Sequence, residues 1–90
     1  MRAADFPLGR LLITRGAQGA LSAHDVWAAL LRHAAGDWGE ISDEDRAENE
    51  LSVSRGLRLL SAYRSALGVK FWVITEADRS ATTILLPEEY

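Results

Sequence analysis

A nearly continuous apolar run makes residues 69–75 (VKFWVIT) the most strand-like segment of the chain. β-branched and aromatic side chains fill nearly every position, and such side chains suit a pleated, buried surface. Val69, Phe71 and Val73 alternate with Trp72 and Ile74, so both faces of the predicted strand are apolar. We therefore predict a central strand that needs cover on both faces.

Further strands are predicted on either side of this segment. Residues 57–64 (LRLLSAYR) and 81–86 (ATTILL) are separated from it by connections of hairpin length, which predicts an antiparallel three-strand meander. Residues 8–14 (LGRLLIT) predict a first strand that ends at a turn. The sheet should therefore contain about four strands and be mainly antiparallel.

A first helix is predicted to begin after Ser22, a good N-cap, because Asp25 places an acid in its first turn. Gly36 suits the position just after the helix, where positive φ is usual. The apolar residues with helical spacing should form one face that covers the sheet, and they are Val26, Trp27, Leu30, Leu31 and Ala34.

A second helix is predicted from Ser42 or Asp43 to about Arg55, with acids in its first turn and Gly56 as its stop. Ala47 and Leu51 are its main apolar residues, so this helix should lie on the surface and expose an acidic face. Together the elements predict an α+β fold with two helices in a single domain, residues 1–90.

Composition narrows the class of protein. The chain has 90 residues, 48% of them hydrophobic and 26% charged, and no apolar run approaches the ~20 residues of a membrane span. It contains no cysteine, which excludes disulfides, thiolate metal sites and a cysteine nucleophile. We expect a cytoplasmic protein that is not bound to a membrane.

The net charge of −3 is concentrated in one segment. Residues 37–54 contain a single basic residue, Arg46, and seven acids, which are Asp37, Glu40, Asp43, Glu44, Asp45, Glu48 and Glu50. This patch could bind a basic protein partner, or it could be a solvated helix face. A mildly acidic chain gives no general reason to expect nucleic-acid binding.

Trp38 lies in a tight corner with Gly39, where a rigid aromatic could anchor a partner or plug the end of the first helix onto the core. The candidate protein-binding residues combine this corner with the acidic helix. They are Trp38, Glu40, Asp43, Glu44, Asp45 and Glu48.

A second set of residues suggests chemistry of another kind. His33, Asp37 and Glu40 lie close together in sequence, where they could serve acid–base catalysis or hold a metal, or His33 could interact as a cation with its helix terminus. An RNA-binding surface of a ribonuclease toxin would use His33, Arg58, Lys70 and Arg79. No catalytic triad order, phosphate-binding loop or zinc pattern is present, so no catalytic residue, metal or cofactor is assigned.

Three segments carry a resemblance to a known family, namely residues 33–40 (HAAGDWGE), 56–63 (GLRLLSAY) and 71–90 (FWVITEADRSATTILLPEEY). The chain resembles small, uncharacterised bacterial proteins encoded on plasmids and integrative elements, which implies a mobile-element context. We expect a non-enzymatic interaction protein, one that inhibits a host defence complex, with a ribonuclease toxin as the alternative. A sheet face without cover would also leave room for a second copy or a bound protein.

Overall fold

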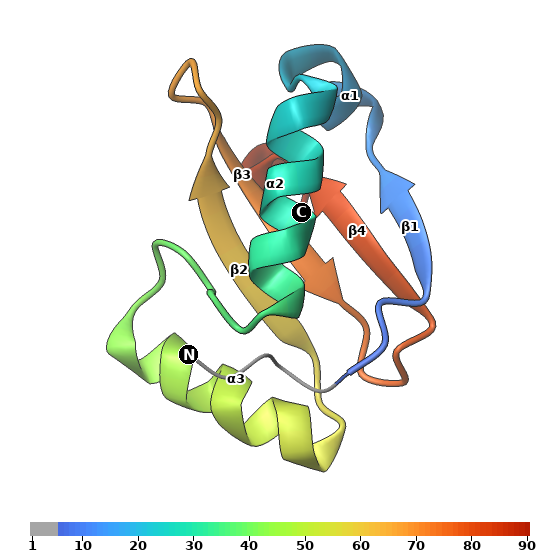
Figure 1. The fold of residues 1–90 in the computed structure, drawn as a ribbon, viewed down its shortest axis with the longest axis vertical. Coiled ribbons are helices and arrows are strands. Elements are labelled where there is room, and N and C mark those ends of the chain that lie inside the picture. The colour runs from blue at the N-terminus through green and yellow to red at the C-terminus, as the bar shows by residue number, and fades with distance from the viewer. Residues whose placement is uncertain (1–5) are drawn as a thin grey trace.

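The computed structural model describes residues 6–90, which fold into a four-stranded sheet with helices beside it (Figure 1). Residues 1–5 of the predicted domain lie outside the described residues. The predicted α+β class is confirmed. The elements in chain order are β1 (Arg10–Ile13), α1 (Arg15–Ala20), α2 (Ala23–Ala34), α3 (Asp43–Arg55), β2 (Leu59–Arg64), β3 (Lys70–Thr75), β4 (Ala81–Leu85) and the 3-10 turn η1 (Pro87–Glu89).

The strand order is β1-β4-β3-β2. Strands β2, β3 and β4 form the predicted antiparallel meander, whereas β1 pairs with β4 in parallel. The sheet is therefore mixed but mostly antiparallel, with β1 and β2 as its two edges. The register places Leu12, Thr83, Ile74 and Leu60 in one row across all four strands.

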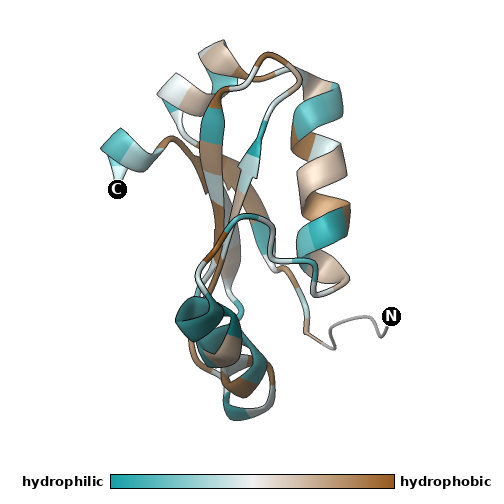
Figure 2. Ribbon diagram, turned by 90° about the vertical axis from the view of Figure 1, so that its left-hand side faces the viewer, coloured by the Kyte–Doolittle hydropathy of each residue, from teal (hydrophilic) through white to brown (hydrophobic). Residues whose placement is uncertain are grey.

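Helix α2 covers one face of the sheet, as Figure 2 shows with the sheet seen nearly edge-on. The Ser22 hydroxyl accepts a hydrogen bond from the Asp25 N–H at 3.1 Å, and Gly36 has φ 81°, so both predicted helix ends are observed. The predicted apolar face is partly wrong, because Trp27 and Leu31 are 58% and 73% exposed. Leu30 is buried as predicted, but its buried neighbours on the helix are Ala29 and His33, so the buried face is rotated by about one residue from the predicted one.

The main core lies between α2 and the sheet. It consists of Ala17, Ala29, Leu30, Tyr63, Phe71, Val73 and Ile84. On the opposite face, η1 and the C-terminal residue provide partial cover, and the rings of Trp72 and Tyr90 lie 5.6 Å apart. Tyr90 remains 67% exposed, while Leu60, Ala62 and Thr83 are half-buried. This second face is therefore apolar and only partly covered.

Polar side chains, not apolar ones, attach α3 to the edge of β2. Ala47 and Leu51 point outward, and Leu51 is 50% exposed, whereas Asn49 and Ser52 are buried. The Asn49 amide donates to the Leu60 carbonyl at 2.7 Å and accepts from the Leu60 N–H at 3.1 Å. A side chain thus replaces a neighbouring strand at this edge, which protects β2 from pairing with another chain.

Asn49→Ala should lower the free energy of unfolding by about 2 kcal/mol, because it leaves two backbone groups of Leu60 without partners in a poorly hydrated place. Urea denaturation followed by tryptophan fluorescence measures the change. The control is Ser54→Ala on the exposed side of α3, which should change stability by less than about 0.5 kcal/mol. Equal effects of the two substitutions would contradict the role of Asn49.

Candidate functional site

The outer face of α3 combines acidic side chains with an exposed apolar centre. Residues three and four positions apart are neighbours on a helix, so Ala47 and Leu51 lie together, with acids on either side. We call this surface the acidic face, and it consists of Asp43, Glu44, Ala47, Glu48 and Leu51. All five side chains are exposed. An apolar centre with a charged rim is the usual arrangement of a protein-binding surface.

No ion pair to the acidic face is formed within residues 6–90. Among the described residues the ion pairs are Arg32 with Asp37 and Arg64 with Glu40, and neither includes an acid of α3. The first-turn acids lie at the positive end of the helix dipole, which stabilises the N-terminus of α3. The acidic face therefore presents charge that a basic partner can bind.

The inner side of α3 is held in place at its C-terminal end by Arg79. This residue lies in the turn between β3 and β4 with φ 62°, a left-handed conformation. Its guanidinium donates to the carbonyl oxygens of Leu57 at 2.6 Å and Ser52 at 2.7 Å. With Asn49 it fixes α3 against the sheet, so the acidic face is carried on a rigid support.

The Trp38 corner does not form an exposed anchor. Trp38 is 1% exposed, packs edge-to-face on the His33 ring at 5.6 Å, and donates from Nε1 to Glu50 at 2.9 Å. Of the two interpretations of Trp38, the structure supports the plug on the core and not the exposed binding anchor, because the corner folds inward. Glu40 is exposed but pairs with Arg64 at 2.9 Å, at the opposite end of β2 from α3.

His33 is buried on the α2 face of the sheet, with 0% of its surface exposed. Its ring nitrogens contact the hydroxyls of Ser61 at 2.6 Å and Thr75 at 2.9 Å. The Thr75 hydroxyl contacts that of Thr82 at 2.7 Å, and Thr82 in turn donates to the Leu8 carbonyl at 2.7 Å. Four polar side chains therefore form one buried hydrogen-bonded chain.

The direction of this chain follows from its last member. A carbonyl can only accept, so Thr82 uses its proton on Leu8, and Thr75 must then donate to Thr82. Thr75 has no proton left for His33, so Nε2 of the imidazole carries the hydrogen and Nδ1 accepts from Ser61. Burial lowers the pKa of His33 to about 4, with a smaller contribution from the positive charge of Arg79. His33 is thus a neutral structural residue.

Because His33 is buried, it can serve neither acid–base catalysis nor metal binding at the surface. A hydroxyl beside an imidazole is the pairing used by nucleophilic enzymes, but Ser61 and His33 are both inaccessible to a substrate. Asp37 forms an ion pair with Arg32, and Glu40 forms one with Arg64. The pKa of Asp37 is lowered, and the main cause is its hydrogen bond from Arg32. The predicted interaction of a protonated His33 with its helix terminus is also wrong, because the ring points into the core.

The residues of the predicted RNA-binding set do not converge. His33 is buried, and the Arg79 guanidinium is bound to backbone carbonyls. Arg58 contacts Tyr90 just before β2, whereas Lys70 pairs with Arg64 at the far end of that strand. Six residues along a strand separate these positions, roughly 20 Å. They do not form one phosphate-binding surface.

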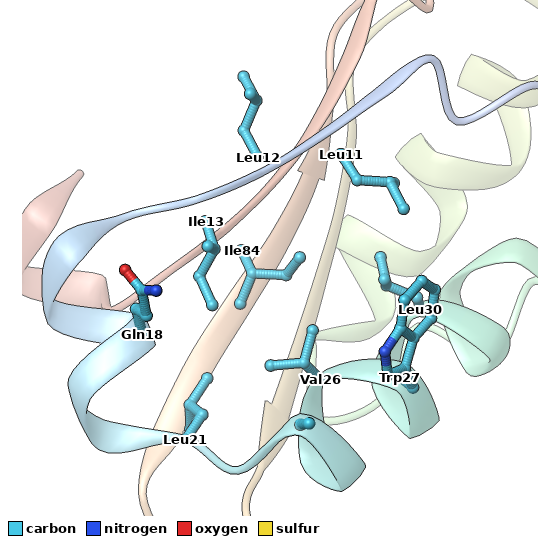
Figure 3. Close-up of a pocket in the computed structure, with 10 residues that line it drawn as sticks. Leu11, Leu12, Ile13, Gln18, Leu21, Val26, Trp27, Leu30 and Ile84 are labelled. Atoms are coloured by element: carbon cyan, nitrogen blue, oxygen red, sulfur yellow. The ribbon is translucent and has the colours of Figure 1, made fainter.

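A surface that the sequence pattern did not indicate lies between β1, α1 and α2 (Figure 3). It is an open groove with a volume of about 320 Å³, and its lining includes Leu11, Ile13, Leu21, Val26 and Trp27. No sequence signal indicated this groove, because helical spacing places Trp27 in the face predicted to cover the sheet, whereas its side chain is 58% exposed.

Comparisons with protein-family models, curated proteins and solved structures find no match to this chain. No helix of residues 6–90 has the length and apolar character needed to cross a membrane. In the same residues, no group of three or more His, Asp and Glu side chains could hold a metal ion.

Proposed function

We propose that this domain is a non-enzymatic protein-interaction module that binds a basic protein through the acidic face. The observation that carries this proposal is the arrangement on α3, where Asp43, Glu44 and Glu48 surround the exposed Leu51 and form no ion pair with any residue of 6–90. A basic partner would gain charge complementarity at the rim and bury Leu51 at the centre. Asn49 and Arg79 hold the helix from behind, which lowers the entropy cost of binding.

The resemblance to mobile-element proteins gives this proposal a setting. Within it, the domain acts in the bacterial cytoplasm and binds a subunit of a host defence complex whose basic surface would otherwise hold nucleic acid. An acidic helix suits that task because nucleic-acid-binding surfaces carry clustered Lys and Arg. The scattered positions of Arg58 and Lys70 and the burial of His33 give the toxin alternative no comparable support.

The test compares two double variants with equal changes of charge. Tagged wild-type protein is used to capture partners from the lysate of a host bacterium, and the affinity of each captured protein is then measured with purified components. Glu44→Gln/Glu48→Gln should weaken binding about tenfold, since each rim charge contributes a modest amount. Added salt should weaken the wild-type complex in the same direction.

The matched control is Glu76→Gln/Glu88→Gln, which removes two exposed acids outside α3. It should leave affinity unchanged, whereas Leu51→Ala should reduce affinity without changing the salt dependence. Equal losses of affinity in the two double variants would show that only the net charge of the domain matters, which would contradict the proposal. Unchanged binding by Glu44→Gln/Glu48→Gln would contradict it as well.

A further inference from the structure

The two edges of the sheet differ in how their backbone groups are satisfied. At β2, the Asn49 amide pairs with Leu60, and the segment around Gly39 pairs with Ala62 through bonds of 2.7 and 3.0 Å. At β1, the residues bonded to β4 alternate, as the bonds from the Arg10 and Thr14 N–H groups show. The intervening Leu11 and Ile13 therefore direct their N–H and C=O groups away from the sheet.

No hydrogen bond to these outward groups of Leu11 and Ile13 is formed within residues 6–90. Figure 1 shows β1 as the outermost strand, with no helix along its free side. Its side chains are not those of a protected edge, because Leu11, Leu12 and Ile13 are 44%, 41% and 38% exposed. An exposed apolar edge of this kind is a template for pairing with another strand.

We propose that β1 pairs with β1 of a second copy of this chain, antiparallel and with the two-fold axis at Leu12, to form a homodimer with a continuous eight-stranded sheet. In this register Leu11 of one copy lies opposite Ile13 of its partner. The outward groups of these two residues then exchange hydrogen bonds, twice in the dimer. The short edge is thus complementary to itself.

Charge complementarity supports a second copy as the occupant. The same register places Arg10 opposite Thr14 of the other copy, on the face that carries η1. The Thr14 hydroxyl donates to Glu89 of its own chain at 2.5 Å, and the Gly16 N–H donates to the same carboxylate at 2.9 Å. Each Arg10 side chain would therefore reach a fixed carboxylate, and the symmetry forms this contact twice.

Apolar burial accompanies the pairing on both faces of the extended sheet. On the face opposite α2, the two Leu12 side chains meet at the axis. On the α2 face, Leu11 and Trp27 both line the groove in Figure 3, where Ile13 of the other copy would join them. Trp27 would thereby lose much of its 58% exposure. The proposal accounts for the edge, the groove and the exposed Trp27 with one partner.

Sedimentation velocity or light scattering from about 1 to about 200 µM tests the association, because the dimer population depends on protein concentration. Wild-type protein should approach twice the monomer mass of 9.9 kDa. Leu12→Lys should weaken dimerisation at least tenfold, since it places like charges opposite each other at the axis. Leu67→Lys, at a 90% exposed position in the β2–β3 turn, is the control and should remain dimeric.

Arg10→Glu provides an independent variant at an exposed position and should also favour the monomer, because it places a carboxylate beside Glu89 of the other copy. A wild-type monomer throughout the concentration range would overturn the proposal, as would a dimer that survives both Leu12→Lys and Arg10→Glu. Circular dichroism confirms that the variants are folded before they are compared.

Cysteine substitution tests the register directly, because the natural chain contains no cysteine. Residues opposite each other in a non-hydrogen-bonded antiparallel pair have Cα atoms about 4.5 Å apart, within reach of a disulfide. Leu12→Cys should thus cross-link rapidly under mild oxidation. Leu11→Cys, equally exposed, should cross-link slowly, because two copies of residue 11 lie more than about 7 Å apart in this register. The reverse order would overturn the register.

Discussion

The free energy of unfolding should fall by about 3 kcal/mol between pH 7 and pH 4 through His33 alone. Burial lowers the pKa of the folded imidazole from 6.5 to about 4, so the unfolded chain binds the proton more readily. The stabilising contribution is complete above pH 6.5 and is lost as the pH falls toward 4. Urea denaturation at intervals across this range measures the slope.

His33→Gln removes this titration, so the variant should show a flatter pH profile than the wild type, whatever its stability at neutral pH. The matched control is His24→Gln, which removes the other histidine from an exposed position and should retain the wild-type slope. A His33→Gln profile as steep as that of the wild type would show that carboxylates, not the imidazole, determine the acid sensitivity. Nitrogen NMR of the wild type should also find the hydrogen on Nε2.

The sequence predicts the elements well wherever local chemistry decides them. Ser22 and Ser42 cap their helices, Gly36 and Gly56 follow the helix ends with positive φ, and the meander pairs as expected. Each of these features depends on a few neighbouring residues, so each can be inferred from a short segment. The parallel pairing of β1 with β4 depends on segments some 70 residues apart, and no local pattern indicates it.

The candidate site residues are harder to predict than the helices and strands. Whether a side chain is buried depends on which face of its helix or strand packs against the rest of the fold. Helical spacing grouped Trp27 and Leu31 with Leu30, although a shift of one residue places them at the surface. The burial of His33 cannot be inferred from its position, because a single polar residue near a helix end gives no sign of Ser61 and Thr75, which approach it from two strands. The exposure of the acids on α3 follows from the sequence, since charge density alone makes burial unfavourable. The exposure of Ala47 and Leu51 does not, because apolar residues on a helix are expected to face the sheet.

The two proposed interfaces, the β1 edge and the acidic face of α3, lie on different parts of the domain. The homodimer would use β1 and leave α3 free, because α3 lies against β2 at the other edge of the sheet (Figure 1). A dimer would therefore present two acidic faces to a partner. Where that partner has repeated subunits, simultaneous binding of both faces would raise the overall affinity without any new contact.

Gly39→Ala should have the largest effect on stability of the substitutions considered, about 4 kcal/mol. Gly39 has φ 76°, and a Cβ atom there would fall on the Ala62 carbonyl and within 2.7 Å of the Tyr63 ring. That carbonyl accepts the Glu40 N–H at 2.7 Å, so the clash would separate the Trp38 corner from the edge of β2. Trp38 and the buried His33 beneath it would then lose their cover.

Gly68→Ala is the matched control, because Gly68 has a similar φ of 84° but nothing within 4 Å of the added Cβ. It carries only the conformational cost of a left-handed residue, about 1 kcal/mol. In a domain of this size 1 kcal/mol corresponds to roughly 4–8 °C in Tm, so thermal unfolding followed by circular dichroism separates the two variants clearly. Equal Tm values would show that Gly39 serves backbone conformation alone. A much lower Tm for Gly39→Ala would establish that close packing of the corner on β2 requires the glycine.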